Sequence, residues 1–238
     1  MRSKRYSRVV LKLSGESLCR ETGHGIDSTS LKVIASEIKA AHATGAEVAV
    51  VVGAGNIWRG ASDRGSAIGR VTADNMGMLA TIINALALQD ALEHMGAATR
   101  VQTAIEIPKV AEAYIRRRAI RHLEKGRIVI FAGGTGNPYF TTDTAAALRA
   151  VEIEAQALLK ATKVDGVYSA DPVVDKNARK FKTLRFMDAV RDRLRVMDAT
   201  ALTLCMENHL PVVVFNLKVK GNIARAVNGQ NVGTVITE

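Results

Sequence analysis

Three glycine-containing turns carry the residues whose types and spacing best suit chemistry on a phosphate. Each turn follows a short apolar run that is typical of a buried strand, and the turns comprise residues 14–17, 53–56 and 131–143. Backbone N–H groups at such turns, and at a helix start that follows one, bind anions. In open α/β sheets, ligands bind beyond the carboxyl ends of the strands. The three turns together therefore predict a phosphate-bearing ligand.

Polar side chains near these turns are candidates for acting on that phosphate. Thr141, Thr142 and Asp143 lie at the expected start of a helix, where the alternative is an ordinary helix cap after a loose turn. Lys12 lies inside the apolar run that precedes the first turn. A lysine is costly in such a run unless its ammonium group reaches a site. The alternative for Lys12 is an edge lysine that extends to water.

The chain lacks the motifs of several other enzyme classes. GxxxxGK[ST] is absent, and Trp58 stands where GxGxxG needs its third glycine, which disfavours a Walker ATPase and a Rossmann dehydrogenase. The histidines have no metal-ligand spacing, and no GxSxG marks a nucleophilic serine. Any metal is therefore expected to arrive with a nucleotide and to bind mainly phosphate oxygens.

Length and composition limit the class of protein. The 238 residues are 47% hydrophobic, which suffices for one sizeable core, and we expect residues 1–238 to form a single domain. We find no apolar run long enough for a membrane span, and the run after the basic N-terminus is too short for a signal peptide. Cys19 and Cys205 form no CxxC pair and are expected as free thiols. These features predict a cytoplasmic protein without membrane association.

The formal net charge of +10 raises the question of nucleic-acid binding. The basic residues gather at positions 116–121, on an expected helix where such runs usually form a solvated face, and at positions 176–185. Aromatic residues make up only 4% of the chain, so platforms for stacking bases are scarce. We therefore expect no nucleic-acid partner, and a basic surface would equally attract nucleotide substrates.

Strand-like and helix-like segments alternate along the chain. Strands are expected at residues 8–13, 47–52, 98–103, 128–132, 157–161 and 212–215, with an edge strand at 233–236. Helices are expected at residues 30–44, 74–95, 110–125 and 199–208, with Asp27 and Ser28 as caps of the first and Asp198 as a cap of the last. This alternation predicts an α/β fold, a three-layer αβα sandwich with a central, mostly parallel sheet.

The expected helix at residues 74–95 is apolar on two sides. Met76, Leu79, Ile82, Ile83 and Leu86 share one side, and Met78, Ala85, Leu88, Leu92 and Met95 share the other. Such a helix is buried on both sides. We predict that one side packs on the sheet and that the other forms a subunit interface, which charged residues at positions 88 and 92 would disrupt.

Five segments give the chain a family resemblance. It resembles the bacterial uridylate (UMP) kinases, a branch of the amino-acid kinase fold family. The segments that carry the likeness are residues 12–16 (KLSGE), 53–60 (GAGNIWRG), 74–80 (DNMGMLA), 134–143 (GTGNPYFTTD) and 160–172 (KATKVDGVYSADP). They follow the family's order and span nearly the whole chain, and the segment ending in Phe-Thr-Thr-Asp is particular to the UMP kinase branch.

The resemblance implies ATP-dependent phosphorylation of UMP to UDP in pyrimidine nucleotide biosynthesis, with Mg²⁺ bound mainly through ATP phosphates. It implies catalytic roles for Lys12, for Asp143, which would hold Lys12, and for Asp198, which would organise the phosphate end. The implied ATP-binding residues are Lys12, Leu13, Ser14, Gly15, Gly55, Arg59, Thr162, Tyr168 and Asp171. The resemblance also divides the chain into an acceptor-binding part at about residues 1–150 and an ATP-binding part at about 151–238.

The acceptor site implied by the resemblance combines charge and backbone contacts. Arg59 suits the UMP phosphate because its planar fork binds two oxygens, and Asp74 suits the ribose hydroxyls because a carboxylate only accepts hydrogen bonds. The alternative for Asp74 is a helix cap. The implied UMP-binding residues are Ala54, Arg59, Asp74, Thr135, Gly136, Asn137, Pro138, Tyr139, Phe140, Thr141 and Thr142. Ala54 departs from the family, which commonly has glycine there, and its methyl group restricts the backbone.

The family is typically a hexamer built from dimers, inhibited by UTP and often activated by GTP, so a homo-oligomer is implied here. Two alternatives within the same fold are a kinase that acts on a carboxylate or carbamate and a non-catalytic store for a nucleotide or oxyanion. A carboxylate or carbamate kinase would not need Asp74 beside Arg59. The presence of Lys12, Asp143 and Asp171 disfavours a non-catalytic store. A basic nucleic-acid regulator is a third alternative, which salt-dependent DNA binding would reveal.

Overall fold

The computed structural model describes residues 5–20, 23–58, 68–170, 174–175, 177–194 and 196–238. These residues form a nine-stranded sheet in the order β4-β3-β5-β2-β1-β6-β8-β9-β7. The strands are β1 Arg8–Leu13, β2 Glu47–Val52, β3 Thr99–Thr103, β4 Glu112–Ala113, β5 Ile128–Ala132, β6 Ala157–Thr162, β7 Thr183–Arg185, β8 Val212–Asn216 and β9 Gly233–Thr237. All described pairings are parallel except that of β8 with β9.

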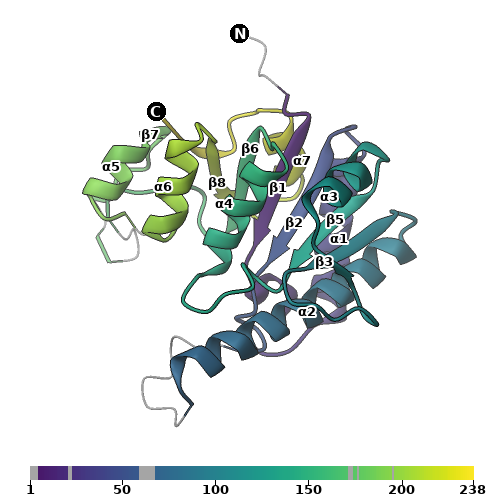
Figure 1. Ribbon diagram of the computed structural model, residues 1–238. Helices are drawn as coiled ribbons and strands as arrows, with labels where there is room; N and C mark the ends of the chain where they lie inside the picture. The colour runs from purple at the N-terminus through teal and green to yellow at the C-terminus, as the bar shows by residue number, and fades with distance from the viewer. Residues whose placement is uncertain (1–4, 21–22, 59–67, 171–173, 176, 195) are drawn as a thin grey trace.

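Helices cover both faces of the sheet, as Figure 1 shows for α4 and α6 in front of it. The helical segments are η1 Gly15–Leu18, α1 Ser28–His42, α2 Arg70–His94, α3 Arg116–Glu124, α4 Thr142–Glu152, α5 Phe186–Arg191, α6 Ala199–Glu207 and α7 Asn222–Val227. The three-layer fold predicted from the alternating pattern is therefore confirmed. Asp27 and Ser28 were proposed as caps, and Asp27 is the N-cap of α1, where its carboxylate accepts from the backbone N–H of Ser30.

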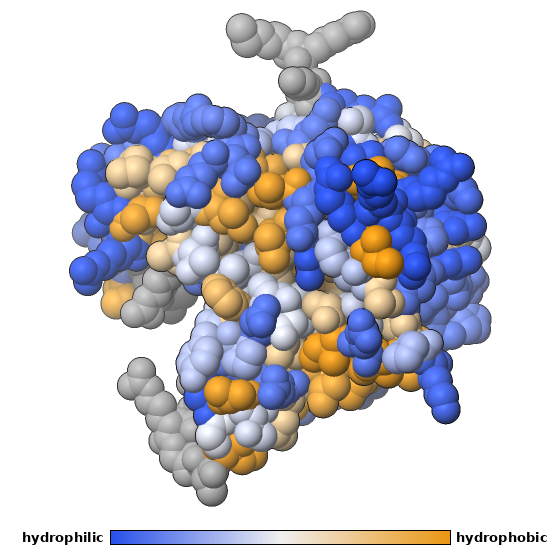
Figure 2. Space-filling model, viewed as in Figure 1, coloured by the Kyte–Doolittle hydropathy of each residue, from blue (hydrophilic) through white to orange (hydrophobic). Residues whose placement is uncertain are grey.

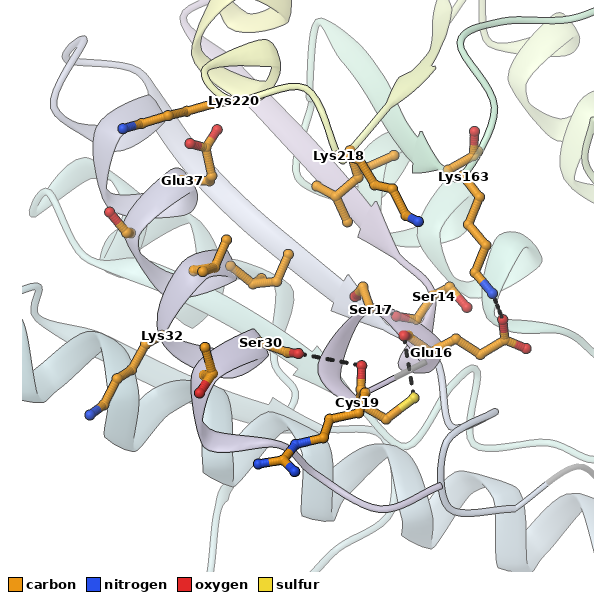
Figure 3. A pocket seen from close by; sticks show the side chains of 18 of the residues that line it. Ser14, Glu16, Ser17, Cys19, Ser30, Lys32, Glu37, Lys163, Lys218 and Lys220 are labelled. Carbon is orange, nitrogen blue, oxygen red and sulfur yellow. Dashed lines mark hydrogen bonds and ion pairs between the residues drawn. The ribbon is translucent and has the colours of Figure 1, made fainter. Parts of the chain in front are cut away.

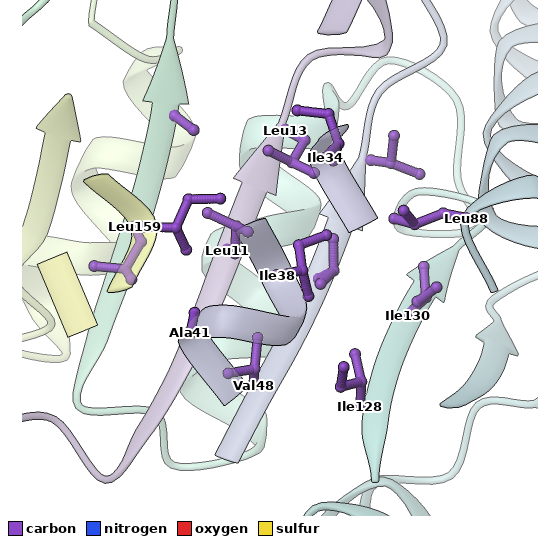
Figure 4. Close-up of a cluster of buried hydrophobic side chains, with 14 of the residues drawn as sticks. Leu11, Leu13, Ile34, Ile38, Ala41, Val48, Leu88, Ile128, Ile130 and Leu159 are labelled. Carbon is purple, nitrogen blue, oxygen red and sulfur yellow. The ribbon is translucent and has the colours of Figure 1, made fainter. Parts of the chain in front are cut away.

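The central strands are apolar throughout because both faces of the sheet are buried. Leu11 and Leu13 of β1 belong to the core under α1 and α2 (Figure 4). Val10 belongs to the core on the opposite face, under α4 and α6. Since successive side chains of a strand alternate between faces, Lys12 points to the α4 side of the sheet. The alternation thus decides on which face the lysine can act.

Three element predictions need correction. The strand at 233–236 was expected at the edge, but β9 lies inside the sheet because the short strand β7 pairs with its outer side. The helix expected at 110–125 begins only at Arg116, because residues 112–113 pair with β3 as β4. The helix expected to start at residue 74 begins one turn earlier, at Arg70.

The two apolar sides of α2 are not used as predicted. Leu88 and Leu92 are fully buried in the core, so the expected subunit contact at these two residues is wrong. Leu79 and Ile83 on the other side are 46% and 51% exposed, and hydrophobic surface gathers over the lower part of the molecule, where α2 lies (Figures 1 and 2). By length and composition α2 could also span a membrane, but core helices that are largely buried pass the same test.

Candidate active site

The three glycine turns meet at the carboxyl ends of β1, β2 and β5. A side chain at Gly15 would place its Cβ 2.4 Å from Asn56 Oδ1 and 2.7 Å from the carbonyl oxygen of Gly53, so only glycine allows the first two turns to approach this closely. Thr142, at the end of the third turn, lies close to the second turn, with its Oγ1 3.4 Å from where a Cβ on Gly53 would lie. The convergence predicted from the sequence is therefore present.

A buried pair of asparagines fixes the second turn against α2. Asn56 and Asn84 exchange side-chain hydrogen bonds of 3.0 and 2.8 Å. Asn84 also donates to the carbonyl of Gly53 at 2.8 Å, and Asn56 donates to that of Gly25 at 2.8 Å. Asn84 was not predicted, and its only signal in the sequence is a polar residue between the apolar positions of a two-sided helix. It holds the backbone of the turn in place.

Two lysines meet one aspartate beside this junction. The ammonium group of Lys12 lies 2.7 Å from Asp143 Oδ1, the ion pair that the resemblance implied. Lys160 of β6, which was not predicted as a site residue, donates to Asp143 Oδ2 at 2.5 Å and to the carbonyl oxygen of Val196. All three side chains are at most 14% exposed. The sequence signal for Lys160 is the same as for Lys12, a lysine within an apolar strand.

The two lysines keep the buried carboxylate of Asp143 in its charged form. Burial alone would raise the pKa of Asp143, but Lys12 and Lys160 together hold the pKa of that carboxyl below its ordinary value. Burial lowers the pKa of Lys160, partly opposed by Asp143. Asp198 also acts on Lys160, so the four groups carry two positive and two negative charges, and Lys12 and Lys160 supply the ammonium groups that a phosphate can meet at this end of the sheet.

Asp198 fastens the start of α4 to the start of α6. Its carboxylate accepts from Thr141 Oγ1 at 2.5 Å, from Thr144 Oγ1 at 3.0 Å and from the backbone N–H of Ala201 at 2.9 Å. The cap predicted for α6 is thus confirmed. Thr141 in turn caps α4 by accepting from the backbone N–H of Asp143 at 3.0 Å. The position of Asp143 therefore depends on Asp198, whereas a role of Asp198 towards phosphate stays a prediction.

Asp74 contacts the loop of residues 135–140 rather than capping a helix. The N-cap of α2 is Gly69, so the helix-cap alternative is wrong. Asp74 Oδ2 accepts from the backbone N–H of Tyr139 at 2.8 Å and forms an ion pair with Arg70 at 2.7 Å. Tyr139, with a φ of 73°, lies in the left-handed region and is exposed, as is Phe140. The acceptor residues predicted on α2 and on the third turn are thus side by side.

A cavity of about 450 Å³ on the α5–α6 side holds two residues predicted to contact the ATP nucleoside, Thr162 and Tyr168. Tyr168 donates from its hydroxyl to Asp165 at 2.7 Å. Residues 192–194 and Val196 form the opposite wall. The cavity adjoins the lysine–aspartate group, because Lys160 and Thr162 lie on the same strand.

A larger cavity, of about 1120 Å³, lies on the opposite face, between α1 and the segment after β8 (Figure 3). Lys163 and Glu16 form an ion pair of 2.6 Å at its rim. The cavity touches Ser14 and Thr162 but neither Asp143 nor Asp74. Size alone would select this cavity, but the smaller one is connected to the lysine–aspartate group, because the carbonyl oxygen of Val196 in its wall accepts from Lys160.

The remaining predicted residues divide into four groups. The side chain of Leu13 is in the core, so only its backbone can contact a ligand. Ala54 is half-buried in the second turn. Gly55 lies at the junction described above, with its nitrogen 2.8 Å from where a Cβ on Gly15 would lie, and residues 135–138 lead up to the Asp74–Tyr139 contact. Arg59 and Asp171 lie outside the described residues.

The carboxylates of the site are already engaged with other groups of the protein. Within the described ranges, no group of three or more His, Cys, Asp or Glu side chains could hold a metal ion. The oxygens of Asp143 and Asp198 face ammonium groups, hydroxyls and a backbone N–H. These residues do not fit a metal held by the protein alone, and an ion carried by a nucleotide would find its ligands on the phosphates.

The fold and the site define an α/β protein that binds a phosphate compound at the carboxyl end of a parallel sheet. The amino acid kinase family model matches residues 7–216. The chain is 44% identical to a UMP kinase from Bacillus anthracis, with a TM-score of 0.95 over 98% of this chain and 97% of that one. It is 39% identical to a UMP kinase from Ureaplasma parvum, with a TM-score of 0.92 over 99% and 100%. The chain belongs to the amino acid kinase family.

A more distant structure shares the fold. The uridylate kinase from Archaeoglobus fulgidus is 31% identical to this chain, with a TM-score of 0.75 over 96% of this chain and 99% of that one. The similarity in all three cases extends over nearly the full length of both chains, so it includes the junction of the turns and both groups of predicted binding residues.

Proposed function

We propose that this protein is a nucleoside monophosphate kinase that transfers the γ-phosphoryl group of ATP to UMP, forming UDP and ADP. The observation that carries the proposal is the junction of three glycine turns beside Lys12 and Asp143, with the Asp74–Tyr139 contact on one side and the Tyr168 cavity on the other. Full-length similarity to two bacterial UMP kinases supports UMP as the acceptor.

ATP binds over the first two turns and extends into the cavity of Thr162 and Tyr168. The backbone of residues 13–15 and 55 cradles the phosphates, with Arg59 beside them, and Asp171 joins the nucleoside contacts. The cavity volume of about 450 Å³ is within the range of small-molecule sites. Lys12 lies where charge develops on the transferred group, and Asp143 holds its ammonium in place.

UMP binds between α2 and the third turn. Asp74 accepts from the ribose hydroxyls, Arg59 and the backbone at Ala54 bind the phosphate, and residues 135–142 surround the base and sugar. A phosphate oxygen of UMP attacks the γ-phosphorus of ATP while the bond to the β–γ bridging oxygen breaks, leaving ADP. This transfer needs positioning and charge neutralisation more than covalent chemistry, which matches a site of turns and ammonium groups.

Mg²⁺ bound to ATP would neutralise charge on its phosphates. The carboxylates of Asp143 and Asp198 already face ammonium groups and a hydroxyl, so the phosphates rather than these residues would hold the ion. Residues 1–150 mainly bind the acceptor and residues 151–238 the adenine nucleoside, within one domain. The reaction belongs to pyrimidine nucleotide synthesis in the cytoplasm, without nucleic-acid or membrane partners.

The protein assembles as a homo-oligomer, a hexamer on the family pattern, inhibited by UTP and activated by GTP. The exposed side of α2 at Leu79 and Ile83 supports the assembly, because two neighbouring large apolar residues one helical turn apart form a contiguous apolar strip on the surface. This surface replaces the Leu88 side, which lies in the core.

A coupled ADP-release assay tests the proposal with UMP, CMP, dTMP, glutamate and aspartate as acceptors. ADP release that depends on UMP is expected. ADP release with glutamate or aspartate but not with UMP would show that the acceptor is a carboxylate and not UMP. Binding of nucleotide without turnover by any acceptor would indicate a store, and salt-dependent DNA binding in the same preparation would indicate a regulator.

A further inference from the structure

Lys160 stands directly beside Lys12 in the sheet. The register of β1 with β6 makes Lys12 and Lys160 partners across the two parallel strands. Both side chains point to the α4 face and are only 12% exposed. Two lysines at such a pair of positions repel each other unless an anion separates them, and Asp143 supplies that anion from the first turn of α4.

The two lysines are held in different ways. Lys160 makes two directed contacts, to Asp143 Oδ2 and to the carbonyl oxygen of Val196. Lys12 lies 2.7 Å from Asp143 Oδ1, and Asp143 is its one partner in the described part of the chain. Lys160 is therefore held by two partners, whereas Lys12 is held by one and keeps hydrogen-bond donors for another acceptor.

We infer that Lys160 is a positioning residue for phosphoryl transfer: it anchors Asp143, so that Lys12 can turn to the transferred phosphoryl group without leaving a buried carboxylate unpaired. The inference rests on the proposed function, since it gives Lys12 its target. Breaking a buried pair by removing one partner is strongly unfavourable. With Lys160 in place, Asp143 keeps one cationic partner when Lys12 moves.

The contact with Val196 extends the role of Lys160 to the nucleoside cavity. Val196 lies in the wall of the cavity that contains Thr162 and Tyr168. Lys160 thus joins, through one ammonium group, the carboxylate at the phosphate end and the wall that faces the adenine nucleoside. Loss of Lys160 is expected to make the positions of both the Asp143 carboxylate and the cavity wall at Val196 less fixed. The effect on Asp143 should be larger, because its contact with Lys160 is a buried, charge-assisted hydrogen bond.

Four charged or titratable groups lie around Asp143, from three elements. They are Lys12 on β1, Lys160 on β6, Asp198 before α6 and Cys205 on α6. Burial and the two carboxylates raise the pKa of Cys205 to about 12, so it stays neutral. Removing Lys160 leaves Lys12 as the only cation of the group, and the pKa of Asp143 then rises towards its ordinary value or above it.

The test compares Lys160→Met, which keeps chain length and apolar volume, with Lys39→Met. Lys39 is a matched control because it also donates to a backbone carbonyl, that of Met95, but on the exposed surface of α1. For Lys160→Met, kcat for UMP is expected to fall roughly 10–100-fold, as for groups that orient catalytic ligands, while KM for UMP changes little. The acid limb of the kcat profile is expected to move to higher pH. Lys39→Met is expected to match the wild type in both respects.

An unchanged kcat and an unchanged acid limb in Lys160→Met would overturn the inference, as would equal effects in the two variants. Circular dichroism checks the fold, and if Lys160→Met does not fold, Lys160→Gln decides by the same criteria. The pKa of the Asp143 carboxyl, followed by ¹³C NMR without substrates, is an independent readout that a purely structural role would not raise. A wild type without UMP-dependent turnover would refute the proposed function, and the NMR result would still decide whether Lys160 holds Asp143.

Discussion

The substitution Asp74→Asn tests whether Asp74 binds the ribose of UMP or only holds the loop at Tyr139. In the structure Asp74 accepts from the backbone N–H of Tyr139 and pairs with Arg70, whose side chain is half exposed. Asparagine has the same shape and keeps one acceptor oxygen for Tyr139. It loses the ion pair, which at such exposure is worth about 0–1 kcal/mol. The free energy of unfolding should therefore fall by no more than about 1 kcal/mol.

The effect on UMP should be much larger than the effect on stability. A hydrogen bond to a charged group contributes about 1.5–3 kcal/mol, and asparagine no longer offers two charged acceptors to the two ribose hydroxyls. UMP affinity should fall by roughly ten- to a hundredfold. ATP affinity should barely change, because Thr162 and Tyr168, the described residues proposed for the ATP nucleoside, line a separate cavity. The difference in affinity between UMP and its 2′-deoxy analogue should also become smaller than in the wild type.

Titration calorimetry with UMP, 2′-deoxy-UMP and ATP measures all three effects. Asp90→Asn is a matched control, because Asp90 is an exposed acid on the same helix and pairs with His94 one turn on. This control should leave all three affinities unchanged. Equal losses for UMP and ATP in Asp74→Asn would refute the assignment, and Asp74 would then only hold the loop at Tyr139.

Three further outcomes follow from the same geometry. Lys12→Ala should lower kcat by about 10²–10³-fold while circular dichroism stays unchanged, and a near wild-type kcat would exclude its role. Leu79→Glu combined with Ile83→Glu should give a smaller species in light scattering with the fold intact, and an unchanged mass would mean that this side of α2 is not an interface. Gly15→Ala should lower both the melting temperature and ATP affinity, because the new Cβ would lie 2.4 Å from Asn56 Oδ1. Wild-type values of both would show that the two turns can move apart at little cost.

The strands and turns of the site could be predicted because their signals are local. A β-branched run such as that of β2, followed by a glycine turn, is legible in a dozen residues. The same holds for the helix caps Asp27 and Asp198, because each capping hydrogen bond reaches a backbone N–H only three residues further on. Short strands are the opposite case, because β4 and β7 exist through pairing with distant partners, and nothing in residues 112–113 distinguishes a strand from a helix start.

The exposed side of α2 could not be predicted for a related reason. Both sides of the helix are apolar, and the periodicity that identifies a core face does so only when the other face is polar. Which side meets the sheet depends on the angle at which the chain enters the helix, and that entry lies one turn earlier than the pattern indicates, at Arg70. The exposed Leu79 and Ile83 therefore become visible only once the sheet beneath Leu88 is in place.

Lys12 and Lys160 show which part of the site the sequence predicts and which part depends on the fold. In the sequence both are single lysines within apolar strands, and neither pattern tells which one reaches a ligand. The register of β1 and β6 makes them neighbours, and α4 places one carboxylate between them. Lys160 also donates to the carbonyl oxygen of Val196, whereas Asp143 is the one partner of Lys12 among the described residues, so Lys12 is the lysine with donors left for a substrate. This difference between the two lysines follows from the register and from the position of Val196, which no single segment contains.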